Sequence, residues 1–299
     1  MNSGFFKKLT VPSKPQSFKS YLDQISRFID SRQTRSLEKL LSEIRSSSIL
    51  KPIERYNLTL KARCLTFDVI GVRSTLEERR KENVRPDIVS LRHLIHFYVS
   101  RGDLAAAEDI VRGLPSYGFL SLDKHMAVTL IAGYGKAGKL EAAEGIYKMC
   151  NGESDIFVES AMMSAYYNCG EYAKALYIVK VTQKPDLVML KIAIKSNIAL
   201  GSLDTFLDDL SNIQRNPRID NRDLKDVFDC LMPRGHVELG YEVAIRAFAK
   251  ALDKWCTEML FRLTEAGHVK TIKFLIDAIP GQPKLLQPEA FKLIVALVD

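Results

Sequence analysis

The sequence predicts an all-α protein, a right-handed α-solenoid of about eight helix–turn–helix repeats, on two observations. A glycine followed five residues later by a small residue recurs about every 31 to 36 residues. Apolar residues at helical spacing lie before and after each such glycine, which indicates two amphipathic helices joined by a turn. Because one pair cannot bury its apolar faces alone, neighbouring pairs must stack, and we expect a concave inner groove. The clearest copies are Gly102/Ala107, Gly138/Ala143 and Gly170/Ala175.

The first two repeats are predicted by extending this pattern toward the N-terminus. They span Phe18–Pro52 and Ile53–Asp87, and apolar residues recur in both at helical spacing. These residues are Tyr21, Ile25, Ile29, Leu37, Leu40 and Ile44, then Leu58, Leu60, Leu65, Val69, Val72 and Leu76.

The third repeat, Ile88–Asp123, shows the template in full. Its first helix ends at Arg101-Gly102-Asp103, because glycine supplies the left-handed geometry of a helix end and aspartate suits the start of the next helix. Pro115 and Gly118 end the repeat. The two apolar stripes are Leu91, Leu94, Ile95 and Tyr98, then Leu104, Ala107, Ile110, Val111 and Leu114.

The same template continues to the end of the chain, and we expect its small residues to let paired helices approach closely. A single helix at Gln287–Asp299 is predicted to cap the solenoid, which covers residues 18–299. The remaining repeats are Lys124–Asp155, Ile156–Asp186, Leu187–Asp220, Asn221–Leu252 and Asp253–Leu286.

Composition excludes several classes of protein. With 46% hydrophobic and 26% charged residues the chain has an ordinary globular composition, and no apolar run is long enough to span a membrane. The five cysteines are scattered and never form a C-x-x-C, which argues for a reducing compartment and against a disulfide framework or thiolate zinc site.

Charge is distributed unevenly. The first 100 residues hold 19 Lys/Arg against 10 Asp/Glu, whereas the other 199 hold 24 against 26, which indicates a polyanion contact in the N-terminal third. Residues 1–17 contain three lysines, several serines and no acidic residue. This segment is interpreted as a basic tail or an organelle transit peptide, with the mitochondrion expected and the plastid as the alternative.

Three runs carry a resemblance to a known family. They are Val-Ser-Leu-Arg-His-Leu-Ile (89–95), Ser-Arg-Gly-Asp-Leu-Ala-Ala-Ala-Glu (100–108) and Leu-Ile-Ala-Gly-Tyr-Gly-Lys-Ala-Gly-Lys-Leu-Glu-Ala-Ala-Glu (130–144). Arg-Pro-Asp at 85–87 and Lys-Pro-Asp at 184–186 each close a repeat. Together they resemble the pentatricopeptide repeat (PPR) family. The tetratricopeptide repeat family is the nearest rival, but its early Trp/Leu/Gly/Tyr signature is missing.

The resemblance implies single-stranded RNA binding at about one base per repeat. In the family, the fifth and last residues of a repeat read the base edge, and the second residue wedges between bases. Asn57 and Asp87 then form a pair associated with uracil, and Ser160 and Asp186 loosely resemble a pair that favours guanine. The predicted wedges are Val89, Phe157 and Val188.

Other repeats depart from the family pattern. The fifth position holds Val128, which cannot hydrogen-bond, or the cations Arg92, Lys191 and Lys225, which would meet phosphate with little base discrimination. The wedge position is polar or charged in further repeats. A short or shape-driven RNA contact is therefore predicted in place of readout of a long sequence.

Several motifs that resemble other sites are interpreted as structural. The G-x-G-x-x-G at 133–138 follows a helical stripe and lacks the strand that a phosphate loop needs. His236-Val-Glu238 lacks the downstream cysteines of a deaminase, and His93 with His96 lacks a third metal ligand. The basic run Arg79-Arg80-Lys81 fits either a solvated helix end or a polyanion contact.

The sequence therefore predicts a non-enzymatic protein without cofactor, metal, membrane span or small-molecule substrate. Two versions of an organellar RNA-associated role stay open: a transcript-specific factor that binds single-stranded RNA, and a structural subunit of the mitochondrial ribosome that contacts rRNA and ribosomal proteins. A third possibility is a protein-binding scaffold that uses the groove as tetratricopeptide repeats do.

Overall fold

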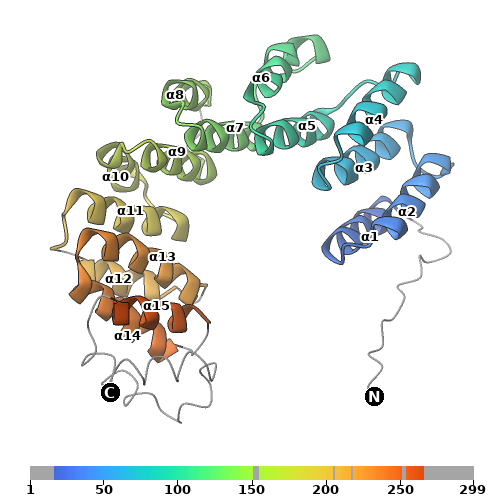
Figure 1. The fold of residues 1–299 in the computed structure, drawn as a ribbon. Helices are drawn as coiled ribbons and strands as arrows, with labels where there is room; N and C mark the ends of the chain where they lie inside the picture. The colour runs from blue at the N-terminus through green and yellow to red at the C-terminus, as the bar shows by residue number, and fades with distance from the viewer. Residues whose placement is uncertain (1–16, 151–154, 205, 217, 251–253, 266–299) are drawn as a thin grey trace, which may run out of the picture. The chain divides into compact units, whose positions relative to one another are not determined.

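The computed structural model describes residues 17–150, 155–204, 206–216, 218–250 and 254–265 (Figure 1). These residues form fifteen α-helices and two 3-10 turns, with no strand among them. The predicted all-α fold of paired helices is confirmed. The chain divides into two compact units, residues 1–153 and 154–299, which are described separately. The predicted tail at 1–17, except Ser17, and the capping helix at Gln287–Asp299 lie outside the described residues.

The first unit contains four helical pairs. The first helices of the pairs pack on one another in chain order, α1 on α3, α3 on α5 and α5 on α7, and each packs on its own second helix. The helices are α1 (Phe18–Asp30), α2 (Thr34–Ser46), α3 (Pro52–Leu65), α4 (Val69–Lys81), α5 (Ile88–Ser100), α6 (Leu104–Gly113), η1 (Leu114–Tyr117), α7 (Lys124–Lys136) and α8 (Leu140–Met149).

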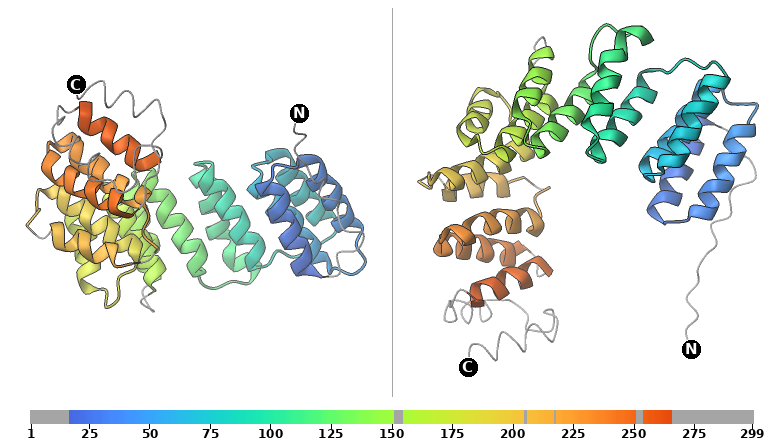
Figure 2. Two further views of the ribbon diagram at one scale, coloured as in Figure 1. Left: turned by 90° about the horizontal axis from the view of Figure 1, so that it is seen from below. Right: turned by 45° about the horizontal axis from the view of Figure 1, so that its top comes forward.

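The second unit repeats the arrangement: α9, α11, α13 and α15 pack in chain order, and the second helices α10, α12 and α14 lie against them (Figure 2). The elements are α9 (Ile156–Asn168), α10 (Tyr172–Val181), α11 (Leu187–Leu200), α12 (Phe206–Gln214), α13 (Asn221–Leu231), η2 (Met232–Arg234), α14 (Val237–Lys250) and α15 (Lys254–Glu265). All eight first helices that the structure describes therefore begin at, or one residue from, the start of a predicted repeat.

The glycine and the alanine of the recurring motif have different roles. Gly102 has a φ of +76° and no atom within 4 Å of the position of a Cβ, so the turn needs glycine for its backbone conformation. Ala107 is fully buried, as are Ala143 and Ala175. The expectation that every small residue serves close approach is thus wrong for Gly102. Close approach occurs instead at Gly133, where a Cβ would lie 2.4 Å from Val99 Cγ1 of α5.

The first two turns achieve the same geometry without glycine. Arg32 between α1 and α2 and Phe67 between α3 and α4 have φ values of 53° and 54°. Left-handed backbone costs an ordinary residue about 1–2 kcal/mol. Because Arg32 and Phe67 occupy the positions that glycine occupies in later repeats, the recurring glycine is absent from the first two repeats of the sequence.

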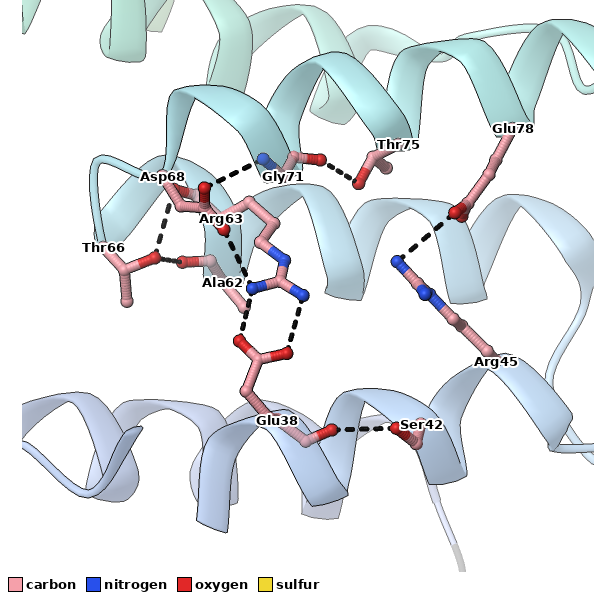
Figure 3. Close-up of polar contacts among 10 residues, drawn as sticks. All are labelled: Glu38, Ser42, Arg45, Ala62, Arg63, Thr66, Asp68, Gly71, Thr75 and Glu78. Carbon is pink, nitrogen blue, oxygen red and sulfur yellow. Dashed lines mark hydrogen bonds and ion pairs between the residues drawn. The ribbon is translucent and has the colours of Figure 1, made fainter. Parts of the chain in front are cut away.

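Apolar and polar contacts hold successive pairs together. Ile25, Leu40 and Leu58 form part of one buried cluster that joins α1, α2 and α3. At its edge Arg63 of α3 bonds both Glu38 of α2 and Asp68 (2.9 Å), the N-cap of α4, as Figure 3 shows. Side chains from three successive helices thereby meet at one guanidinium.

Candidate functional site

The candidate site comprises the first turns of the first helices, where the predicted contact residues lie. Asp87 and Asp186 are the N-caps of α5 and α11. The other eight residues lie within the first two turns of α3, α5, α9, α11 and α13. Most of them are either exposed apolar side chains or side chains bonded to the start of the next first helix, and Ser160 is instead buried.

The predicted wedges are exposed apolar side chains. Phe157 of α9 is 66% exposed, Val188 of α11 44% and Val89 of α5 36%. Apolar side chains that face solvent do not stabilise the hydrophobic core. Their exposure therefore suits contact with a ligand. Their wedge role stays a prediction.

Asn57 and Asp87 form a buried hydrogen-bond network. Asn57 is 6% exposed, and its Nδ2 donates to the Asp87 carboxylate oxygens at 3.1 and 2.9 Å. The Ser90 hydroxyl donates to Asn57 Oδ1 at 2.7 Å, and the Ser90 amide donates to Asp87 Oδ1 at 2.9 Å. Asp87 therefore caps α5 and holds α3 at once, which fixes the amide of Asn57 in one orientation.

Arg92 makes the equivalent contact one repeat later. Its Nε and Nη2 donate to the two carboxylate oxygens of Asp123 at 2.8 and 2.7 Å, the forked geometry that suits guanidinium and carboxylate. Asp123 is the N-cap of α7. Burial alone would raise the pKa of Asp123, but the hydrogen bond and charge of Arg92 lower it below its ordinary value.

Lys191 and Lys225 are paired in the second unit. Lys191 Nζ lies 2.5 Å from the carboxylate of Asp223, in the first turn of α13. Lys225 Nζ lies 2.6 Å from Asp229 and 3.1 Å from Glu258 of α15. Burial acts to lower the pKa of Lys225, but its two carboxylate partners raise it above the ordinary value.

These contacts share one design. We use the name inter-repeat clamp for a bond from the fifth residue of a repeat to an acidic side chain at the start of the next first helix. The predicted cations therefore have carboxylate partners already, and a phosphate would have to compete with them. The clamps are Asn57–Asp87, Arg92–Asp123, Lys191–Asp223 and Lys225–Glu258.

The fifth and last residues do not always bond. Ser160 is buried, 7% exposed, while Asp186 accepts the Met189 amide of α11 at 2.8 Å. Val128 borders a pocket with Val99 and Gly133 between α5 and α7. Sequence reasoning thus found the fifth positions but missed three acidic partners. The missed signal was an opposite charge about one repeat period downstream of each cation.

Motifs that resemble other sites have structural positions. Gly133 of the G-x-G-x-x-G motif lies inside α7, and Gly138 lies in the turn after it, so the motif spans the end of a helix and its turn, and no described residue before it forms a strand. Burial lowers the pKa of His93 to about 4, with Lys61 and His96 adding to the effect. In the described ranges no three metal-ligand side chains gather at one place. None of the helices described combines the length and apolar character needed to cross a bilayer.

The stacked first helices, their alternation with second helices and the clamps between first turns define a helical-repeat protein. Residues 126–152 match the family model of the PPR repeat. This segment is therefore similar to a pentatricopeptide repeat, and the helical-repeat fold of the chain is shared with solved repeat structures.

Two solved structures illustrate the similarity. The crystal structure of the pentatricopeptide repeat protein PPR10 in complex with an 18-nt psaJ RNA element matches 96% of this chain, with a TM-score of 0.53 and 15% sequence identity. This chain spans 47% of that one. A tetratricopeptide repeat protein from Parabacteroides merdae ATCC 43184 matches 86% of this chain and 99% of its own, with a TM-score of 0.51 and 12% identity. No curated protein matches the chain in sequence.

Proposed function

We propose that this chain is a non-catalytic protein that binds single-stranded RNA and acts in mitochondrial gene expression, through the stability, processing or translation of a transcript. The observation that carries the proposal is the repeated geometry of the first turns. In some repeats the second residue is an exposed apolar side chain. Three residues later a polar side chain is bonded to the start of the next first helix, as in Val89 with Arg92 and Val188 with Lys191.

This geometry suits an unstacked base. An apolar side chain offers a surface for the face of a base, and a fixed polar side chain offers hydrogen bonds to its edge. Because the Asn57–Asp87–Ser90 network fixes the Asn57 amide, binding would order few new side-chain rotamers. The shared fold with PPR10, whose structure holds an RNA element, is consistent with this ligand.

The proposal is tested by two aromatic side chains with the same exposure. Phe157 of α9 and Tyr177 of α10 are both 66% exposed, but only Phe157 lies on a first turn. We expect Phe157→Ala to raise the Kd for a random-sequence single-stranded RNA about tenfold, since base stacking on an aromatic ring contributes about 1–3 kcal/mol. Tyr177→Ala should leave the Kd unchanged. Equal Kd values for both variants and the wild type would refute the placement of RNA on the first turns.

A structural role in the mitochondrial ribosome is the second candidate. It is favoured by the clamps at Arg92, Lys191 and Lys225, because cations already paired with carboxylates are less available to capture the phosphates of a free strand. A protein-binding scaffold is the third candidate. Sedimentation of organelle lysate with and without RNase separates them. A transcript factor should migrate as a small RNase-sensitive complex, and a subunit should migrate with a ribosomal particle.

The proposed compartment is the mitochondrion, with the plastid as the alternative. It is supported by the basic, acid-free segment at residues 1–17 and by the excess of Lys and Arg in the first 100 residues. Imaging of the full chain with a C-terminal fluorescent tag tests it. A diffuse cytosolic signal would refute both compartments.

A further inference from the structure

A pocket rich in arginine lies at the ends of second helices and reaches Pro86, the residue before Asp87, the N-cap of α5. It is bordered by the end of α4, by the segment between α4 and α5, and by η1, which follows α6. The pocket therefore joins the second-helix ends of two successive repeats in the first unit. We call it the arginine pocket, and its charged lining residues are Arg79, Arg80 and Arg85.

The charge of the arginine pocket is not neutralised by its own walls. No acidic residue lines it, and within the described part of the chain Arg79, Arg80 and Arg85 have no carboxylate within ion-pair distance. Arg80 also borders a neighbouring hollow that contains Glu77 and Asp103. The contrast with the clamps is clear, since Arg92, Lys191 and Lys225 each have a carboxylate partner.

One arginine of the pocket is fixed in place and incompletely bonded. Arg79 Nη1 donates to the Val84 carbonyl at 3.1 Å, which holds the guanidinium against the wall. Its Nε is buried without a hydrogen-bond partner. A neighbouring pocket that shares Arg79 is lined by Glu78, Glu82 and Tyr56, and the Tyr56 hydroxyl is also buried without a partner. Buried donors without acceptors are rare, and they indicate that an acceptor group belongs nearby.

An aromatic ring completes the pocket. Tyr117 of η1 is 42% exposed and lines the same wall as Pro86 and Pro115, whose rings hold the backbone there in fixed conformations. Guanidinium groups match the oxygens of a phosphate, and an exposed tyrosine ring offers a face on which a base can stack. An acidic peptide would use the arginines but would have no use for the ring, so the combination favours a nucleotide.

We propose that the arginine pocket binds one nucleotide of a single-stranded RNA, with its phosphate on Arg80 and Arg85 and its base on Tyr117. The inference rests on the proposed function, because it takes RNA as the ligand. It adds a contact on the second-helix ends to those on the first turns. Of the two interpretations of the basic run at 79–81, the proposal takes the polyanion contact for Arg80.

The test measures binding of the full chain to a short random-sequence single-stranded RNA by fluorescence anisotropy across a KCl series. Arg80 and Arg85 are exposed, so Arg80→Gln and Arg85→Gln should fold, which circular dichroism checks. We expect each to raise the Kd about fivefold and to reduce the slope of log K against log salt by about 0.7, the loss of one phosphate contact. Lys81→Gln is the matched control, since Lys81 is exposed on the same helix end but does not line the pocket.

The tyrosine has its own variants. Tyr117→Ala should raise the Kd without changing the salt slope, and Tyr117→Phe should bind as the wild type does, because the ring and not the hydroxyl makes the contact. A salt slope that falls in Tyr117→Ala would contradict the assignment of the base to this ring.

The outcomes separate the pocket from the proposed function. If Arg80→Gln and Arg85→Gln bind RNA as Lys81→Gln does, while Phe157→Ala still weakens binding, the pocket proposal fails and RNA binding stands. If the wild type binds no RNA, both fail. Binding of a labelled polyglutamate peptide that is lost in Arg80→Gln and Arg85→Gln would then make the pocket a docking site for an acidic protein segment.

Discussion

At the scale of single residues, the aspartate in two of the clamps serves two purposes. Asp87 caps α5 and accepts from Asn57 of α3, the preceding first helix, and Asp123 caps α7 and accepts from Arg92 of α5. The positions of Asn57 and Arg92 were predictable, because helical period and turn signals are local. The hydrogen bonds that these side chains make were not predictable, because they depend on the position of the next first helix along its axis. That position is set by packing between helices.

Loss of one clamp side chain should destabilise the first unit. Asn57→Ala leaves the Ser90 hydroxyl and the Asp87 carboxylate without their buried partner, which costs about 1–3 kcal/mol. Urea denaturation followed by circular dichroism measures the free energy of unfolding. Lys39→Ala, at an exposed position of α2, is the control and should change it by about 0.5 kcal/mol or less. Equal effects of the two substitutions would contradict the clamp.

His93 makes stability depend on pH. Burial lowers its pKa to about 4 in the folded chain from an ordinary 6.5, and the charges of Lys61, His96 and Arg92 oppose protonation, while Asp87 favours it. The unfolded chain therefore binds the proton first as pH falls. Stability that is present above pH 6.5 should decline toward pH 4, by about 1–3 kcal/mol.

The measurement for His93 is urea denaturation at a series of pH values. His93→Gln should flatten the decline, whereas His96→Gln, at an exposed position of the same helix, should keep it. An unchanged decline in His93→Gln would assign the pH dependence to other groups.

At the scale of elements, the turns between paired helices need a left-handed residue, and the chain supplies it in two ways. Gly102 does so without strain, whereas Arg32 does so with a Cβ at a φ of 53°. The glycine turns were predictable from the sequence, because glycine marks this conformation. The turns at Arg32 and Phe67 were not, since neither residue type signals a positive φ.

Exchanging residues at two turns should therefore have opposite effects. Arg32→Gly removes the strain and should stabilise the chain by about 1 kcal/mol, reduced by the greater freedom of glycine in the unfolded chain. Gly102→Ala introduces the strain and should destabilise it by about 1 kcal/mol, because nothing crowds the new methyl group. Thermal unfolding of the two variants checks both signs, and a stabilising Gly102→Ala would contradict the conformational role of this glycine.

At the scale of the whole molecule, each pair contacts mainly its neighbours, so stability is a sum of local terms. Repeat boundaries were predictable because each repeat carries the same local signals. The division into two compact units, residues 1–153 and 154–299, was not predictable, because no local sequence signal marks it.

A core truncation should act locally. Leu40 of α2 is fully buried in the cluster that joins α1, α2 and α3, and Leu40→Ala should cost about 2–5 kcal/mol there. Hydrogen exchange should show lost protection in α1 to α3 and unchanged protection in α13 and α14, which belong to a separate cluster. Uniform loss of protection across the chain would show that it unfolds as a single cooperative body.

The clamps also bear on how such a protein can be recombined. Each repeat is completed by the opening residues of its successor, so a cassette cut at the sequence boundary after Asp87 would separate Asn57 from Ser90. A cut after Ser90 would move the whole network as one piece. Repeats that are exchanged between proteins, by design or by duplication, therefore keep this network only when the junction falls about one helical turn after the repeat boundary in the sequence.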